Sequence, residues 1–163
     1  MDSVALIVGV RNYWSNDPII QSLLGVSNSS GALRRILSRS TSYASLQGGY
    51  QYPGIALTVN DEEVIESINT NNIELCAELI SSVKIKDSSM TLVKLKDRLK
   101  SITVNKTNVD NNHVIINNQA QALGYYPKIR GIFWVGGSPI IYKEMGTERL
   151  HILECTFKMI LGD

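Results

Sequence analysis

The last segment of the chain, residues 148–161, constrains the fold most, because apolar and polar side chains alternate along almost its whole length. Alternation with a period of two predicts a β-strand that buries one face and exposes the other. The chain must therefore build a sheet that is covered on one side. The inward set is His151, Leu153, Cys155, Phe157, Met159 and Leu161, and the outward set is Arg149, Glu154, Thr156 and Lys158.

One strongly amphipathic helix is predicted over residues 88–102, where apolar residues recur at helical spacing and charged residues occupy the other side. Asp87, Ser88 or Ser89 is expected to cap it, since each has a side-chain oxygen that can accept from the first turn. This helix is expected to cover one face of the sheet. Its apolar stripe is Leu92, Leu95, Leu99 and Ile102, and its charged side is Lys94, Lys96, Asp97, Arg98 and Lys100.

Further strands are predicted in the middle and near the end of the chain. Residues 55–59 alternate, and Asn60 and Asp61 are expected to turn the chain. Residues 73–85 fit both a strand and a helical spacing, and their turn-like flanks favour the strand. Residues 129–135 form an apolar run that predicts another strand.

Short helices are predicted at the N-terminus. The first covers about residues 3–14. The second starts at Asp17-Pro18, because Asp suits the N-cap and Pro has no amide hydrogen to waste at the first helical position. Gly25 suits the left-handed position that follows. Residues 32–38 are expected to form a third short helix after a polar loop.

These elements predict an α/β fold of the α+β kind, with one mixed, mainly antiparallel sheet of about four to five strands. The sheet is expected to pack against one long helix and the short N-terminal helices. A chain of 163 residues matches a single domain, 1–163. The expected core includes Leu92, Leu95, Leu99, Leu153, Cys155 and Phe157.

Two polar segments interrupt this pattern, a loop at 38–51 and an Asn-rich insertion at 104–122 that is expected to form a hairpin arm. Both hold few apolar residues to offset the entropy cost of ordering them. We therefore expect them to contact neighbouring subunits and to become ordered only on assembly.

No catalytic constellation is recognisable in the sequence. His113 and His151 have no metal-ligand spacing, and Cys76 and Cys155 lie in separate apolar segments, as free buried thiols do. The acids at 61–63 are consecutive and cannot converge on one cation. Neither a P-loop nor a nucleophile elbow occurs. We expect no enzyme activity and no catalytic, cofactor-binding or metal-binding residues.

Charge argues against a dedicated nucleic-acid-binding domain, because 16 basic and 15 acidic residues leave a net charge of +1. A local basic spot remains at Arg34, Arg35 and Arg39. No segment approaches the run of about 18 apolar residues that a membrane span needs. No signal peptide is recognisable, so the chain is expected in the cytoplasm where it is made.

The order of the elements is informative in itself. Two short helices come first, and a loop containing tyrosine and proline leads into the strand at 52–57. A turn leads to the long strand at 73–77, the amphipathic helix 87–102 follows, and a pair of strands ends at 149–158. This order resembles the tail-terminator or tail-completion family of tailed bacteriophages and related contractile injection machines.

The resemblance covers nearly the whole chain and implies a structural role. In that family, a small α/β domain assembles as a hexameric ring at the head-proximal end of the tail tube, stops tube polymerisation and joins the tail to the neck. It implies a homo-hexamer whose partners are the tail tube protein and neck or connector proteins. It also implies a place in the virion tail or neck after assembly in the host cytoplasm, with no membrane, cofactor or small-molecule substrate.

The candidate subunit-interface or channel-facing residues are Arg34, Arg35, Arg39, Tyr43 and Tyr50. Tyrosine brings apolar area and a polar tip. Arginine can contact the phosphates of passing DNA without sequence preference. We expect instead that these arginines pair with acidic residues of a neighbouring subunit. Two alternatives stay open: a small viral binding module that contacts nucleic acid, and an accessory enzyme with an unrecognised site.

Overall fold

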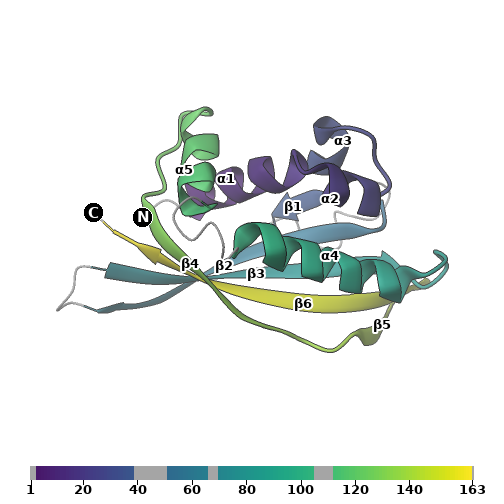
Figure 1. Ribbon diagram of the computed structural model, residues 1–163. Helices are drawn as coiled ribbons and strands as arrows, with labels where there is room; N and C mark the ends of the chain where they lie inside the picture. Colours follow the sequence, from purple (N-terminus) through teal and green to yellow (C-terminus); the bar gives the residue numbers. More distant parts are fainter. Residues whose placement is uncertain (1–2, 39–50, 66–69, 105–111, 163) are drawn as a thin grey trace.

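A computed structural model describes residues 3–38, 51–65, 70–104 and 112–162, which form one sheet covered by helices (Figure 1). The strand order is β1-β2-β3-β6-β4, and β5 also pairs with β6. Every pairing is antiparallel except that of β1 with β2. The strands are β1 (Ile36–Ser38), β2 (Gly54–Ile65), β3 (Thr70–Ser82), β4 (Ile129–Gly137), β5 (Ile141–Met145) and β6 (Glu148–Leu161).

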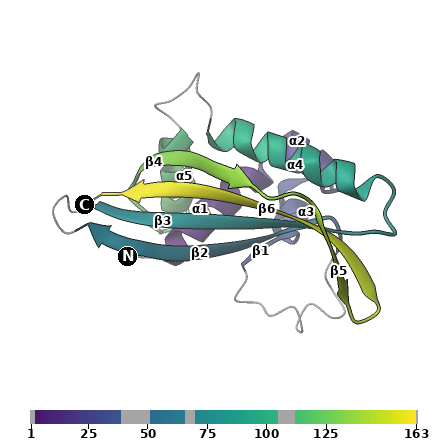
Figure 2. The ribbon, with the colours of Figure 1, turned by 90° about the horizontal axis from the view of Figure 1, so that it is seen from below.

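The helices lie together on one face of the sheet, and the view from below looks onto the other face (Figures 1 and 2). The predicted fold class and the predicted cover by the long helix are therefore confirmed. The helices are α1 (Ser3–Ser15), α2 (Pro18–Leu23), α3 (Ser29–Leu33), α4 (Ser88–Thr103) and α5 (Asn112–Gln121).

The main core lies between the helices and the sheet, centred on Phe157 of β6. This ring is fully buried and lies 5.9 Å from the Trp14 ring of α1 and 5.2 Å from the Trp134 ring of β4, centroid to centroid. The predicted inward side of β6 and the predicted stripe of α4 meet here. The expected core residues are all buried: Leu92, Leu95, Leu99, Leu153, Cys155 and Phe157.

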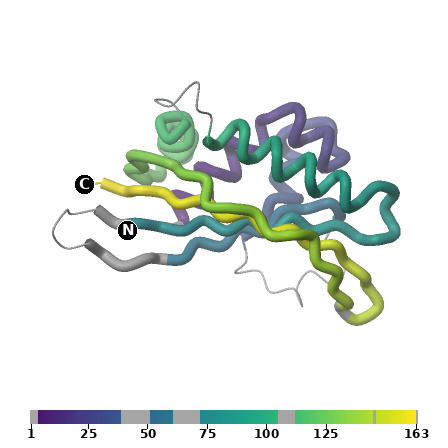
Figure 3. Tube along the Cα trace, turned by 60° about the horizontal axis from the view of Figure 1, so that its bottom comes forward, coloured from purple at the N-terminus to yellow at the C-terminus, as the bar shows by residue number. Residues whose placement is uncertain are grey.

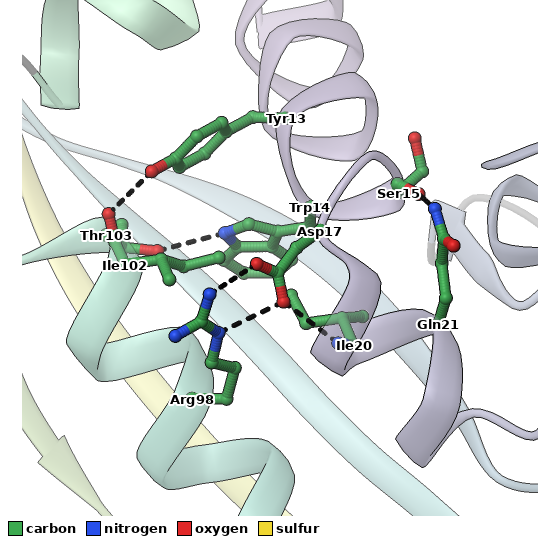
Figure 4. A network of polar contacts seen from close by, with 9 residues as sticks. All are labelled: Tyr13, Trp14, Ser15, Asp17, Ile20, Gln21, Arg98, Ile102 and Thr103. Atoms are coloured by element: carbon green, nitrogen blue, oxygen red, sulfur yellow. Dashed lines mark hydrogen bonds and ion pairs between the residues drawn. The ribbon is translucent and has the colours of Figure 1, made fainter. Parts of the chain in front are cut away.

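Polar contacts join α1 and α2 to α4 (Figure 4). Asp17 caps α2 by accepting from the Ile20 amide, as the sequence predicts, and its carboxylate also accepts two hydrogen bonds from Arg98 of α4. Nearby, the Trp14 indole donates to Thr103 Oγ1 at 2.9 Å. The Tyr13 hydroxyl donates to the carbonyl of Ile102 at 2.8 Å. These bonds satisfy groups that burial would otherwise leave unpaired.

A second, smaller apolar cluster lies on the opposite face of the sheet. It joins the start of β2, the end of β3 and the start of β6, and Tyr52 packs against it. Both faces of the sheet are therefore apolar at this end. The buried members are Ala56, Ile80, Leu150 and Ile152.

The prediction of a helix over residues 32–38 is wrong. Asn28 caps α3 earlier by accepting from the Gly31 amide, so the helix ends at Leu33. The buried Ile36 then starts β1, which runs parallel to β2 opposite Ile55. The parallel pairing gives this backbone partners that a helix would have had to supply.

The predicted turn at Asn60 and Asp61 is also wrong, because β2 runs straight through both residues. β3 supplies a partner for each, Glu74 for Asn60 and Ile73 for Asp61. A bulge follows between Asp61 and Val64, where the register shifts. Bulges let polar residues remain within a strand while bending it.

The predicted hairpin arm within 104–122 is replaced by α5, although residues 105–111 lie outside the described part. α5 buries Ile116 and Ala120, which are one helical turn apart, and packs against α1. Gly9 of α1 makes this approach possible, since a Cβ there would lie 2.8 Å from the Ile116 carbonyl oxygen and 3.2 Å from Ala120 Cβ. α5 thus packs against α1 of its own subunit.

Candidate subunit interface

Arg35, one of the candidate interface residues, forms bonds within its own subunit. Its Nη1 donates to the carbonyls of Tyr52 (2.9 Å) and Pro53 (3.3 Å), and its Nη2 donates to Gln51 Oε1 (3.2 Å). These bonds hold the segment before β2 against the end of α3. No local pattern signals this role, because backbone carbonyls accept hydrogen bonds whatever side chain they carry.

Arg34 follows α3 and is exposed. It lines a shallow hollow between α2 and α3 with Gly25, Asn28 and Gly31. The neighbours Arg34 and Arg35 therefore do not share one basic surface. The remaining candidates, Arg39, Tyr43 and Tyr50, lie outside the described residues.

The described histidines do not meet as a catalytic pair. His151 lies on β6 with its Nδ1 2.6 Å from Ser88 Oγ, at the start of α4. The Tyr142 ring packs edge-on against it at 6.4 Å. His113 is part of α5, which packs against α1 rather than near Ser88. The contact between His151 and Ser88 joins β6 to the start of α4.

Both cysteines are buried and free. Burial raises the pKa of Cys155 to about 12. Burial and, to a smaller extent, a hydrogen bond to Glu74 raise the pKa of Cys76 to about 11. Thiols with such values are protonated at neutral pH and are weak nucleophiles and metal ligands.

Within the described ranges, no group of three or more His, Cys, Asp or Glu side chains is arranged to hold a metal ion. None of the helices there is long and apolar enough to cross a membrane.

The sheet face away from the helices is polar near the start of β3 and the end of β6 and apolar at its β4 margin. Glu74 of β3 and Lys158 of β6 are direct cross-strand neighbours there. Phe133 of β4 pairs with Lys158 and is 51% exposed. Val135, further along β4, is 58% exposed. Large apolar side chains left open at a sheet margin mark a surface where another molecule can bind.

The outer edge of β4 is covered by α5 at its first residue, Ile129. There the Asn117 amide of α5 both donates to the Ile129 carbonyl (2.9 Å) and accepts from its amide (3.0 Å). The side chain thus substitutes for a neighbouring strand. From Gly131 to Gly137, no described strand pairs with this edge.

The opposite edge of the sheet has a matching open stretch. β1 pairs with β2 only from Ile55 to Leu57, so from Thr58 onward the outer edge of β2 has no partner among the described strands. The two open stretches belong to different strands on opposite sides of one sheet (Figure 2). An unpaired edge offers amide and carbonyl groups to another chain.

No protein-family model and no curated protein sequence matches this chain.

Proposed function

We propose that this protein is a structural ring subunit that caps the head-proximal end of a phage-type tail tube and joins it to the neck or head. Its partners are other copies of itself, the tube protein and neck or connector proteins. The subunit has no catalytic task in this role, and its place is the tail or neck of a virion.

The observation that carries the proposal is the presence of two unlike open edges on one sheet, one on β4 and one on β2. A ring of identical subunits needs head-to-tail contacts, in which one surface of each copy meets a different surface of the next. Two unlike edges on opposite sides of a rigid sheet meet this need.

The arrangement of elements supports the same role. Two short N-terminal helices, a long antiparallel pair, one amphipathic helix and a long closing strand occur in the order that resembles tail terminators. Among the described residues, the helices leave one sheet face uncovered, and no strand pairs with the outer side of β4 from Gly131 to Gly137 or of β2 beyond Leu57. A ring subunit can use such surfaces for its head-to-tail contacts.

The test is to measure the mass of the full chain by size-exclusion chromatography with light scattering, followed by electron microscopy. A closed ring with a central opening is expected, and we expect six copies in it. A chain that stays monomeric at every concentration, or that forms only two-fold dimers, would contradict the proposal. Salt-sensitive retention on DNA by a monomer would favour the nucleic-acid-binding alternative instead.

A further inference from the structure

We propose that β4 of one copy pairs with the open part of β2 in the next copy, so that the sheet continues from subunit to subunit. This inference rests on the ring function proposed above and names the contact that forms the ring. The occupant of each edge is a second copy of this chain.

Strand direction favours this partner. β2, β3, β6 and β4 are each antiparallel to their neighbour, so β4 and β2 run in opposite directions. Placing the β2 edge of one copy beside the β4 edge of another therefore makes an antiparallel pair, with the helices of both copies on the same side. Antiparallel pairing is the arrangement already used from β2 through β3 and β6 to β4.

The two open stretches also lie at the same level along the strands. Reading straight across the sheet, Phe133 of β4 is level with Lys158, then Glu74, then Asn60 of β2. Gly136 is level in the same way with Thr58. A second copy can thus join without sliding along the strand axis, and its Asn60 would lie beside Phe133. In the tube trace, the β5–β6 hairpin lies at the opposite end of the sheet from this level (Figure 3).

Bulges restrict where the edges can pair. β4 changes register between Ile129 and Gly131 and again between Trp134 and Gly136, and β2 changes register after Asp61. Bulges and charges are the usual protection of an edge strand against unspecific pairing. They leave a short regular stretch on each strand, around Phe133 and around Asn60, which fits one partner in one register.

The test is disulfide trapping with the double variant Asn60→Cys/Phe133→Cys. Thr58→Cys/Phe133→Cys tests a register shifted by two residues along the strand. In the proposed register, Asn60 of one copy and Phe133 of the next would lie within the Cα separation that a disulfide accepts. After mild oxidation, the double variant is expected to give a ladder of linked subunits up to the ring size on a non-reducing gel. Single variants are expected to stop at dimers. Asn60→Cys/Lys143→Cys is the matched control, because Lys143 is exposed on β5 at the other end of the sheet.

The outcomes separate this inference from the ring function. Rings by light scattering without a ladder in either double variant would overturn the β2–β4 contact and leave the ring function standing. A ladder that grows without closing would support the contact and overturn the ring. Monomers that show neither rings nor a ladder would overturn both.

Discussion

Arg98 of α4 binds both carboxylate oxygens of Asp17, the residue that caps α2, with Nε 3.0 Å from Oδ2 and Nη2 on Oδ1. Only 11% of the Asp17 side chain and 29% of the Arg98 side chain are exposed. The pair therefore holds the N-terminal helices to the long helix in a place where solvent screens it weakly.

We expect Asp17→Asn to lower the free energy of unfolding by about 1–3 kcal/mol at neutral pH. Asn can still cap α2, so the loss reports on the bond to Arg98. Urea unfolding followed by circular dichroism measures it. Asp97→Asn is the control, because Asp97 is 69% exposed and meets only Lys96 at 3.9 Å among the contacts described. An equal loss of unfolding free energy in both variants would show that the Asp17–Arg98 pair stabilises the fold no more than an exposed pair does.

The effect of Asp17→Asn is also expected to depend on pH. Burial alone would raise the pKa of Asp17, but the hydrogen bonds from Arg98 and Ile20 and the charge of Arg98 hold it below 3.8. A carboxylate with a lowered folded pKa contributes stability that is present above its unfolded pKa and lost as pH falls through the folded value. The difference between wild type and variant should therefore be constant near neutral pH and shrink below about pH 4.

Phe157→Ala is expected to cost about 3–5 kcal/mol, because it removes a fully buried ring between two tryptophans and leaves a cavity. Denaturant unfolding monitored by tryptophan fluorescence suits this variant. Phe133→Ala removes the same ring from an exposed site and is expected to change stability by less than about 0.5 kcal/mol. A loss below about 1 kcal/mol for Phe157→Ala would show that the core has been misplaced.

Asn117→Ala is expected to destabilise the protein by about 1–3 kcal/mol, since the amide and the carbonyl of the buried Ile129 both lose their partner. Hydrogen exchange at Ile129 is expected to accelerate with it. The neighbouring Asn118 is exposed, so Asn118→Ala provides the comparison. Unchanged protection at Ile129 would mean that the edge does not depend on this side chain.

The two native thiols are expected to resist a thiol reagent at pH 8 in the folded protein, because burial raises the pKa of Cys76 to about 11 and that of Cys155 to about 12. Both are expected to react once urea unfolds the chain. Asn60→Cys supplies an exposed thiol that reacts at once, as a check on the reagent. Rapid modification of a native thiol before urea is added would show that the structure around that cysteine opens in the folded protein.

Elements with a strong internal pattern were predictable from the sequence. The alternation in β6 and the stripe of α4 bury many residues each, so their periodicity is strong. The cap at Asp17-Pro18 and the positive φ of 75° at Gly25 follow from local chemistry that needs no tertiary contact.

Elements that depend on a partner were missed. β1 is only 3 residues long and exists because β2 lies beside it. α5 buries only Ile116 and Ala120, too few positions for a helical period to stand out. β5 likewise depends on pairing with β6.

The candidate interface residues adjoin one another and the loop in the sequence, but neighbours in sequence can point in different directions. Arg35 donates to carbonyls in its own subunit while Arg34 stays exposed. The open edges of β2 and β4 depend on which strands lie outermost. That order is set by pairing between segments far apart in the chain, which no local pattern records.

Gly9 links the insertion to the N-terminal helix in evolutionary terms. A side chain there would collide with the backbone of α5 at Ile116, so a related chain that keeps this helix in place needs glycine at that position. A relative that lacks residues 112–121 would have room for any helix-forming residue. Glycine and the insertion should therefore be gained and lost together, and their joint inheritance would reveal in an alignment the helix that periodicity alone did not.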